Sequence, residues 1–159
     1  KYLMKILPKQ KPAKNQGPWM NEEIQKMLGA TTNLRNKAII HFLASTGCRI
    51  GALHDLTIAD LKKIEDGAIV WLYDEDLERY RTCLTPEAYR ALMDYFGFRS
   101  EKGYPATKED DPIFTQRDYK TPITYEGSRE ILAKIQKTAG LRGHKAENKI
   151  SSKAPNHAF

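Results

Sequence analysis

The 159-residue sequence predicts an α+β domain that is mainly α-helical and carries a small antiparallel β-sheet on one side. Apolar residues recur at helical spacing over residues 21–29 and 33–45. The turn signal Asp66-Gly67 precedes an apolar run at 68–73 that has the composition of a buried strand. Thr85-Pro86-Glu87 combines an N-cap threonine, a first-turn proline and an acid, which together begin a helix. The length fits one domain with a genuine core.

The first 17 residues differ in composition from the rest of the chain. They contain five lysines and no acid, and so supply +5 of the net charge of +6. Pro8 and Pro12 interrupt any apolar period, so we expect residues 1–17 to be a basic linker or arm and the domain to occupy 18–159. Such an arm is either a solvated linker or a contact to DNA phosphates that reads no sequence.

Two helices are predicted at the start of the domain. In the first, Asn21 is the expected N-cap, acids follow in the first turn and Gly29 lies near the end. The second runs from about Asn33 to Ser45 and has one apolar face, formed by residues 34, 38, 39, 42 and 43.

Arg49 stands out because apolar segments flank it on both sides. Gly47 ends the preceding helix, and a short helix is expected from Ala52 to Leu56. If Arg49 is buried by these flanks, its guanidinium has to meet an anion or a carboxylate to offset the cost of desolvation. The alternative is an arginine at a helix start that reaches solvent.

A hairpin and two further helices complete the prediction. The strand at 68–73 is expected to turn through the acidic residues 74–78 and to return at 79–84. A helix should then run from Pro86 to about Phe96, followed by a polar loop over 97–111 and a short extended piece at 111–114. The last helix should open near Thr124 and end at Ala139-Gly140.

Cys48 and Cys83 are the only cysteines, and their spacing is that of neither a metal site nor a disulfide framework. We expect both to be small core residues in a reducing compartment. No apolar run has the length of a membrane span and no signal peptide is visible, so the sequence predicts a cytoplasmic protein without a membrane partner.

Several segments, in this order, resemble the catalytic domain of the tyrosine recombinase (phage integrase) family. They are an opening helix, a first arginine box, a hairpin-to-helix junction, a stretch before the next helix and the start of a His-x-x-Arg box. These segments are residues 21–28, 46–56 with Asp60-Leu61, 84–89, 112–114 with 123–124, and 154–159. Each motif alone is common, whereas their order and spacing together are specific.

The resemblance implies DNA strand cleavage and rejoining through a 3'-phosphotyrosyl intermediate, as in site-specific recombination and integration. The implied partner is double-stranded DNA, and neither a metal nor a nucleotide cofactor is needed. Arg49 matches one of the two family arginines that bind the scissile phosphate, for which a planar guanidinium is suited. His157 matches the histidine of the second box, which suits proton transfer or hydrogen bonding at that phosphate.

The chain departs from the family pattern in three places. Ala52 stands where the family usually has an acid that braces the arginine, and Asp55 is the nearest substitute in sequence. Glu78 stands where a hairpin lysine commonly acts as general acid, and Arg79 or Arg81 is a poor proton donor at neutral pH.

The third departure is that the chain ends at Phe159, before the family's second arginine and its nucleophilic tyrosine. We therefore expect a fragment that is inactive and monomeric alone, from an enzyme that works as a tetramer on paired sites. Six of the eight tyrosines, all of which precede His157, are expected to be core and hairpin aromatics: Tyr73, Tyr80, Tyr89, Tyr95, Tyr119 and Tyr125.

Two other functions remain open at this point. One is a degenerate, non-catalytic DNA-binding module related to integrases, which Ala52 and Glu78 favour. The other is a helical protein-interaction domain with no nucleic-acid role, because residues 18–159 carry a net charge of only +1. Salt-dependent binding to duplex DNA separates the last hypothesis from the other two.

Overall fold

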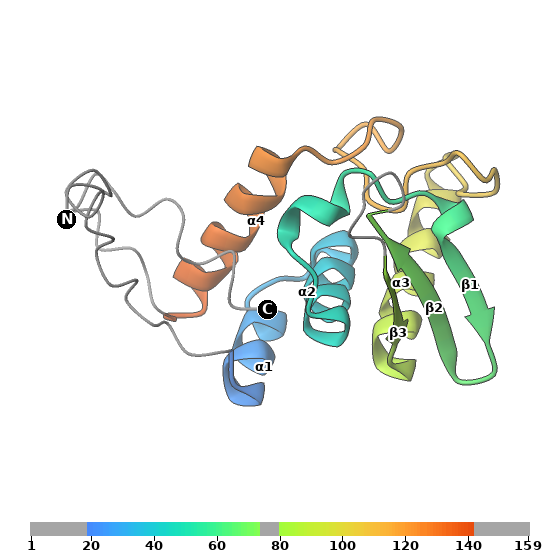
Figure 1. Ribbon diagram of the computed structural model, residues 1–159. Coiled ribbons are helices and arrows are strands. Elements are labelled where there is room, and N and C mark those ends of the chain that lie inside the picture. Colours follow the sequence, from blue (N-terminus) through green and yellow to red (C-terminus); the bar gives the residue numbers. More distant parts are fainter. Residues whose placement is uncertain (1–18, 74–79, 142–159) are drawn as a thin grey trace, which may run out of the picture.

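The computed structural model describes residues 19–73 and 80–141. Within these ranges the chain forms four α-helices, two short 3-10 helices and a three-stranded sheet. In chain order the elements are α1 (Asn21–Gly29), α2 (Leu34–Thr46), η2 (Ile50–Leu53), η3 (Ile58–Asp60), β1 (Leu61–Ile64), β2 (Gly67–Leu72), β3 (Tyr80–Leu84), α3 (Pro86–Glu101) and α4 (Tyr125–Thr138). The sheet lies at one side of the helical body, and α2 lies between it and α4 (Figure 1). The predicted fold class is confirmed.

Three of the helices begin with the side-chain caps that their sequences provide. The Asn33 side chain accepts a hydrogen bond from the Asn36 N–H at 3.2 Å at the start of α2. Thr85 and Thr124 do the same for α3 and α4, at 3.3 and 3.0 Å. These bonds satisfy backbone donors that have no partner within the helix.

The predicted cap of α1 is wrong by one residue. Met20 occupies the N-cap position, and Asn21 is the first helical residue. The Glu23 carboxylate reaches back and accepts a hydrogen bond from the Met20 N–H at 2.9 Å. An acid at the third helical position can satisfy the cap backbone whichever side chain the cap carries, so the asparagine was a misleading signal.

The sheet has one more strand than predicted. Its order is β1-β2-β3 with both pairs antiparallel, and Glu65-Asp66 turns the chain from β1 into β2, which begins at Gly67. Strand β1 escaped prediction because its residues are mostly exposed and include Lys62 and Lys63, so it lacks an apolar period. Gly67 has φ +150°, and a Cβ there would lie 2.4 Å from the Leu84 carbonyl oxygen, so β3 approaches more closely than a side chain would permit.

Helix α3 continues to Glu101, five residues beyond its predicted end. Its buried face repeats at Ala88, Leu92, Tyr95 and Arg99, which is helical spacing. Arg99 is 2% exposed, and it donates hydrogen bonds to the carbonyls of Pro112 at 2.7 Å and Tyr119 at 3.3 Å. The polar composition after Phe96 predicted a loop. The helix continues instead, because Arg99 is buried and hydrogen-bonded to backbone carbonyls.

The predicted short helix from Ala52 to Leu56 is also displaced. A 3-10 turn covers Ile50–Leu53 instead, and Leu56 accepts a hydrogen bond from the Ile113 N–H at 2.9 Å. This bond and the isolated bridge between Thr57 and Pro112 confirm the predicted extended piece at 111–114. The helix does not continue to Leu56 because the backbone of Leu56 and Thr57 pairs with residues 112–113 instead.

The core lies between α2, α3 and the sheet. Phe42, Tyr95 and Phe114 are its largest fully buried side chains, and the Phe42 and Phe114 rings meet edge to face with centroids 5.3 Å apart. Cys48 is buried, as predicted, but Cys83 is exposed on β3 and the prediction of a core residue there is wrong. Successive strand residues alternate between faces, and Leu84 takes the inward position. Among the described residues no helix is both long and apolar enough to cross a bilayer.

Candidate functional site

The candidate site is built on the turn that ends α2. Gly47 adopts the left-handed conformation, with φ 64°, and its N–H donates to the Leu43 carbonyl at 2.9 Å. A glycine takes this conformation without the strain that a Cβ introduces. The chain then leaves the helix in extended form, and Arg49 precedes η2 as its N-cap residue.

Arg49 is exposed, which agrees with the second of the two alternatives that the sequence left open, an arginine at a helix start that reaches solvent. Cys48 and Ile50 are 1% and 3% exposed and point into the core. Arg49 lies between them with φ −67° and ψ 144°. In extended backbone adjacent side chains point in opposite directions, so the burial of its two neighbours directs Arg49 outward. The Arg49 side chain therefore points away from the core.

Two tyrosines lie next to Arg49. The Tyr73 hydroxyl accepts a hydrogen bond from the Arg49 N–H at 3.3 Å, and the Tyr73 and Tyr80 rings lie 5.9 Å apart. Partial burial raises the pKa of both phenols, and the Arg49 hydrogen bond acts against this rise at Tyr73. Both hydroxyls are thus protonated donors at neutral pH. We had expected these tyrosines only as core or hairpin aromatics, and no local signal in the sequence places them beside Arg49.

Ser45 joins this turn to the hairpin-to-helix junction. Its hydroxyl donates to the Cys83 carbonyl at 3.2 Å and accepts from the Thr85 N–H at 2.8 Å. The arginine box and the Thr85-Pro86 junction, which are far apart in sequence, are therefore adjacent in the structure. A single hydroxyl that serves both as donor and as acceptor fixes the end of α2 relative to β3.

Asp55, the nearest carboxylate in sequence, pairs with a neighbouring histidine. The Asp55 carboxylate lies 2.9 Å from Nε2 of His54, and both side chains are exposed. The other ring nitrogen of His54, Nδ1, contacts the Gly51 carbonyl oxygen. Ala52 is buried in the core. The sequence position at which related proteins were expected to brace the arginine therefore contributes an apolar contact here.

His157, the other predicted site residue, lies outside the described residues. The hairpin residues Glu78 and Arg79 lie outside them too. Arg81, which follows them on β3, places its guanidinium 5.8 Å from the Trp71 ring centroid. Over residues 19–73 and 80–141, no group of three or more His, Cys, Asp or Glu side chains is arranged to hold a metal ion. The described part of the site thus consists of the Arg49 guanidinium, the phenols of Tyr73 and Tyr80, and the neighbouring pair of Arg81 and Trp71 on the sheet.

This arrangement is suited to binding a phosphate. The guanidinium of Arg49 is a permanent cation with planar donors, and its backbone is held at both ends by buried neighbours. A hydrogen bond to a charged phosphate is stronger than one between neutral groups. Phenolic hydroxyls nearby add donors that stay protonated at neutral pH. The described residues thus provide binding and positioning groups.

Comparisons with known proteins agree with this fold. No family model and no curated protein matches the sequence. Among solved structures, that of XerA recombinase is similar with a TM-score of 0.66 and 21% identity over 84% of this chain. XerH site-specific recombinase bound to difH substrate in a pre-cleavage complex gives 0.64 and 19% over 88%. The XerH post-cleavage complex with a palindromic difH substrate gives 0.63 and 20% over 81%.

The likeness shows a shared fold. A helical body with a small three-stranded antiparallel sheet matches tyrosine recombinase structures over most of this chain. The chain spans 46% of the XerA chain and 41% and 38% of the two XerH chains, which is less than half of each.

Proposed function

We propose that this chain is part of a tyrosine-type site-specific recombinase, which cleaves and rejoins DNA through a 3'-phosphotyrosyl intermediate. The fold shared with the Xer recombinases supports the class of protein. The observation that carries the proposal is the position of Arg49, whose exposed side chain stands on a turn fixed by α2 and the sheet. The proposed partner is double-stranded DNA, with four protomers acting on paired duplexes.

Arg49 would bind the non-bridging oxygens of the scissile phosphate. Charge builds on these oxygens as the attacking and leaving oxygens exchange, and a fixed guanidinium stabilises that charge without reorganising. Tyr73 would hold the backbone of Arg49, which keeps the side chain in register with the phosphate. Tyr73 is therefore a positioning residue in this proposal.

The remaining chemical groups of the proposal lie elsewhere. His157 would donate a hydrogen bond or a proton to the same phosphate. The chain spans less than half of the recombinases it resembles, and we place the nucleophilic tyrosine and the second arginine in sequence outside these 159 residues. Attack by the tyrosine oxygen on phosphorus forms the phosphotyrosyl ester and releases a 5'-hydroxyl. Attack by a 5'-hydroxyl on that ester reverses the step and frees the tyrosine.

DNA binding measured against salt tests the role of Arg49. The purified chain should bind duplex DNA with an affinity that falls steeply with salt, because each phosphate contact releases counterions. Arg49→Ala should weaken binding and lower the slope of log K against log salt by about one contact. The matched control is Arg90→Ala, which removes the same charge from an exposed position on α3.

The outcomes separate the hypotheses. An unchanged affinity and slope for Arg49→Ala, with the control also unchanged, would contradict the phosphate-ligand role. Binding without any salt dependence, or no binding, would favour a helical protein-interaction domain. In either case the proposed recombinase chemistry would lose its support.

A degenerate DNA-binding module is the second candidate, and the burial of Ala52 favours it. The position faces the core rather than Arg49, so no brace is available from it. In such a module Arg49→Ala would still weaken DNA binding. A cleavage assay distinguishes the enzyme from the non-catalytic module. This chain is joined to the sequence that follows it in its reading frame and is tested on a nicked suicide DNA substrate. A covalent protein–DNA adduct that Arg49→Ala abolishes supports the enzyme, and salt-dependent binding without an adduct supports the module.

A further inference from the structure

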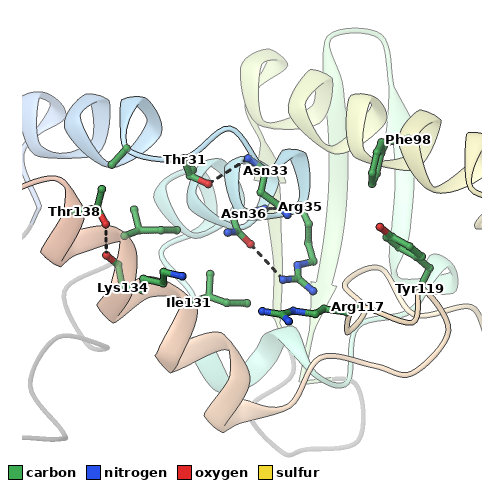
Figure 2. A pocket seen from close by; sticks show the side chains of 12 residues that line it. Thr31, Asn33, Arg35, Asn36, Phe98, Arg117, Tyr119, Ile131, Lys134 and Thr138 are labelled. Atoms are coloured by element: carbon green, nitrogen blue, oxygen red, sulfur yellow. Dashed lines mark hydrogen bonds between the residues drawn. The ribbon is translucent and has the colours of Figure 1, made fainter.

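A second basic site lies at the opposite end of α2 from Arg49. An open cavity of about 480 Å³ is lined by residues from the start of α2, the loop 115–122 and α4. Figure 2 shows Arg35, Arg117 and Lys134 reaching into this space from those three parts of the chain. Since a helix rises 1.5 Å per residue, the length of α2 separates it from the Arg49 turn by about 20 Å. We call it the basic cavity.

The basic cavity has an unbalanced charge. Its lining includes the three cations Arg35, Arg117 and Lys134 and no carboxylate. Over the described ranges, 19–73 and 80–141, none of these three side chains forms an ion pair. Cations that gather in a concave site with low-dielectric walls raise the local concentration of anions. The lining therefore favours a negatively charged occupant.

Arg35 is held in place before any ligand arrives. Its Nη1 donates to the Thr115 carbonyl at 2.8 Å, and the fully buried Thr115 hydroxyl lies 2.7 Å from that of Tyr95. Burial lowers the pKa of Arg35, and the charge of Arg117 lowers it further. The Arg35 Nε is buried without a hydrogen-bond partner. The Arg35 guanidinium is thus fixed through Nη1 to the Thr115 carbonyl, and the positive charge of Arg117 lies near it.

Two acids line a cleft that adjoins the basic cavity. A wider cleft shares Arg35, Arg117 and Lys134 and adds Asp118 and Glu130. Asp118 accepts hydrogen bonds from the Lys120 N–H at 3.1 Å and from the Thr121 N–H and hydroxyl, so its carboxylate caps its own loop. These bonds lower the pKa of Asp118. The Asp118 carboxylate is thus occupied by hydrogen bonds within the loop.

We propose that the basic cavity binds a phosphate group, held by Arg35, Arg117 and Lys134. The N-terminus of α2, capped by Asn33, also borders the cavity and adds the positive end of the helix dipole. The cavity has more room than one phosphate fills, and Phe98 and Tyr119 line it with aromatic surface. The phosphate therefore belongs either to a small phosphomonoester whose organic part contacts these rings or to the DNA backbone. The residues of this site are distinct from Arg49, and only the DNA alternative rests on the proposed function.

Nuclear magnetic resonance with inorganic phosphate as the probe tests the site. The amide signals of residues 33–37, 116–119 and 130–135 should shift and saturate as phosphate is added to the 159-residue chain at constant ionic strength. Arg117→Ala and Lys134→Ala should each weaken the binding about ten-fold, since each removes a charge-assisted contact. Both side chains are exposed, so these variants keep the fold. Lys137→Ala removes an equal charge one turn further along α4, outside the cavity lining, and should leave the affinity unchanged.

Adenosine monophosphate and a duplex oligonucleotide identify the source of the phosphate. If the small molecule is the ligand, it should bind more tightly than inorganic phosphate and broaden or shift the Phe98 and Tyr119 ring signals. If DNA is the ligand, the duplex should shift the same amides, and Arg117→Ala should weaken duplex binding while the monophosphate shows no gain over inorganic phosphate. Either pattern supports a phosphate site.

Two results would overturn the proposal. One is the absence of saturable shifts at these amides with all three probes. The other is an equal loss of affinity in Lys137→Ala, which would indicate attraction by overall charge. Arg49→Ala distinguishes this site from the proposed recombinase function, because the phosphate-dependent shifts of residues 33–37, 116–119 and 130–135 should be unchanged in this variant even where it weakens DNA binding.

Discussion

The Arg49 N–H donates to the Tyr73 hydroxyl across 3.3 Å, so the arginine turn is tied directly to the residue that follows β2. Tyr73 itself has φ 58°, a conformation that is uncommon for a residue with a side chain. Tyr73 therefore combines the hydrogen bond to Arg49 with a left-handed backbone conformation.

Tyr73→Phe should remove the hydrogen bond and keep the ring. We expect a loss of about 1 kcal/mol in the free energy of unfolding, measured with urea, because a buried or half-buried hydrogen bond contributes about that much. Duplex DNA binding should also weaken if the bond positions Arg49. The control is Tyr89→Phe on α3, where no effect on DNA binding is expected.

Gly67→Ala should destabilise the fold strongly. The new Cβ would lie 2.4 Å from the Leu84 carbonyl oxygen, and φ +150° strains any side chain. We expect a loss of about 2 kcal/mol or more in the free energy of unfolding. Gly97→Ala is the matched control, because it lies within α3 and a Cβ there meets nothing within 4 Å. That substitution should stabilise the helix by about 0.5–1 kcal/mol. Similar effects at both glycines would contradict the close approach of β3.

Arg99→Met should show that the arginine supports the loop after α3. It would leave the Pro112 and Tyr119 carbonyls without the donors they now have. We expect a loss of about 2–4 kcal/mol in the free energy of unfolding, seen as a lower midpoint in urea. Arg90→Met on the exposed side of the same helix should change it by less than about 0.5 kcal/mol. Equal stability of the two variants would be inconsistent with the buried bonds.

The two cysteines should react very differently with a thiol reagent. Burial raises the pKa of the Cys48 thiol to about 11, whereas Cys83 is exposed. At pH 8 the reagent should label Cys83 rapidly and leave Cys48 unlabelled, because the thiolate is the reactive form. Labelling followed by mass spectrometry with Cys83→Ser as control checks this. Rapid labelling of Cys48 in the folded variant would contradict its burial.

The same burial has a consequence for stability at high pH. The folded-state pKa of Cys48 is raised from 9.0 to about 11, so the folded form prefers the neutral thiol. Its stabilising contribution is present below pH 9 and is lost as the pH rises toward 11. The free energy of unfolding should therefore fall across this window, and the fall should be smaller in Cys48→Ala. An identical decline in both proteins would argue against the shift.

The sequence predicted what depends on local hydrogen bonding and on periodicity. Thr85-Pro86 and Thr124 begin helices because their own side chains cap the backbone a few residues on. Gly47 ends α2 because the left-handed cap requires little more than a glycine. These features need no information about distant parts of the chain.

The features that escaped prediction depend on tertiary contacts. Strand β1 exists because β2 pairs with it, and the last turns of α3 exist because Arg99 finds carbonyls in the loop that follows. The sequence left the burial of Arg49 open, and the structure places its neighbours in the inward positions. The candidate site was therefore located by motif, while its exposure and its tyrosine neighbours came only from the fold.

The bonds from Arg99 to the loop after α3 also bear on how the protein can change in evolution. Hydrogen bonds from Arg99 and to Asp118 fix the path of residues 112–121. The Arg117 side chain is exposed at the basic cavity and forms none of these bonds. Mutation can therefore exchange Arg117 for a neutral or acidic residue at little cost in folding. Selection can therefore change which charge the basic cavity prefers without changing the stability of the domain.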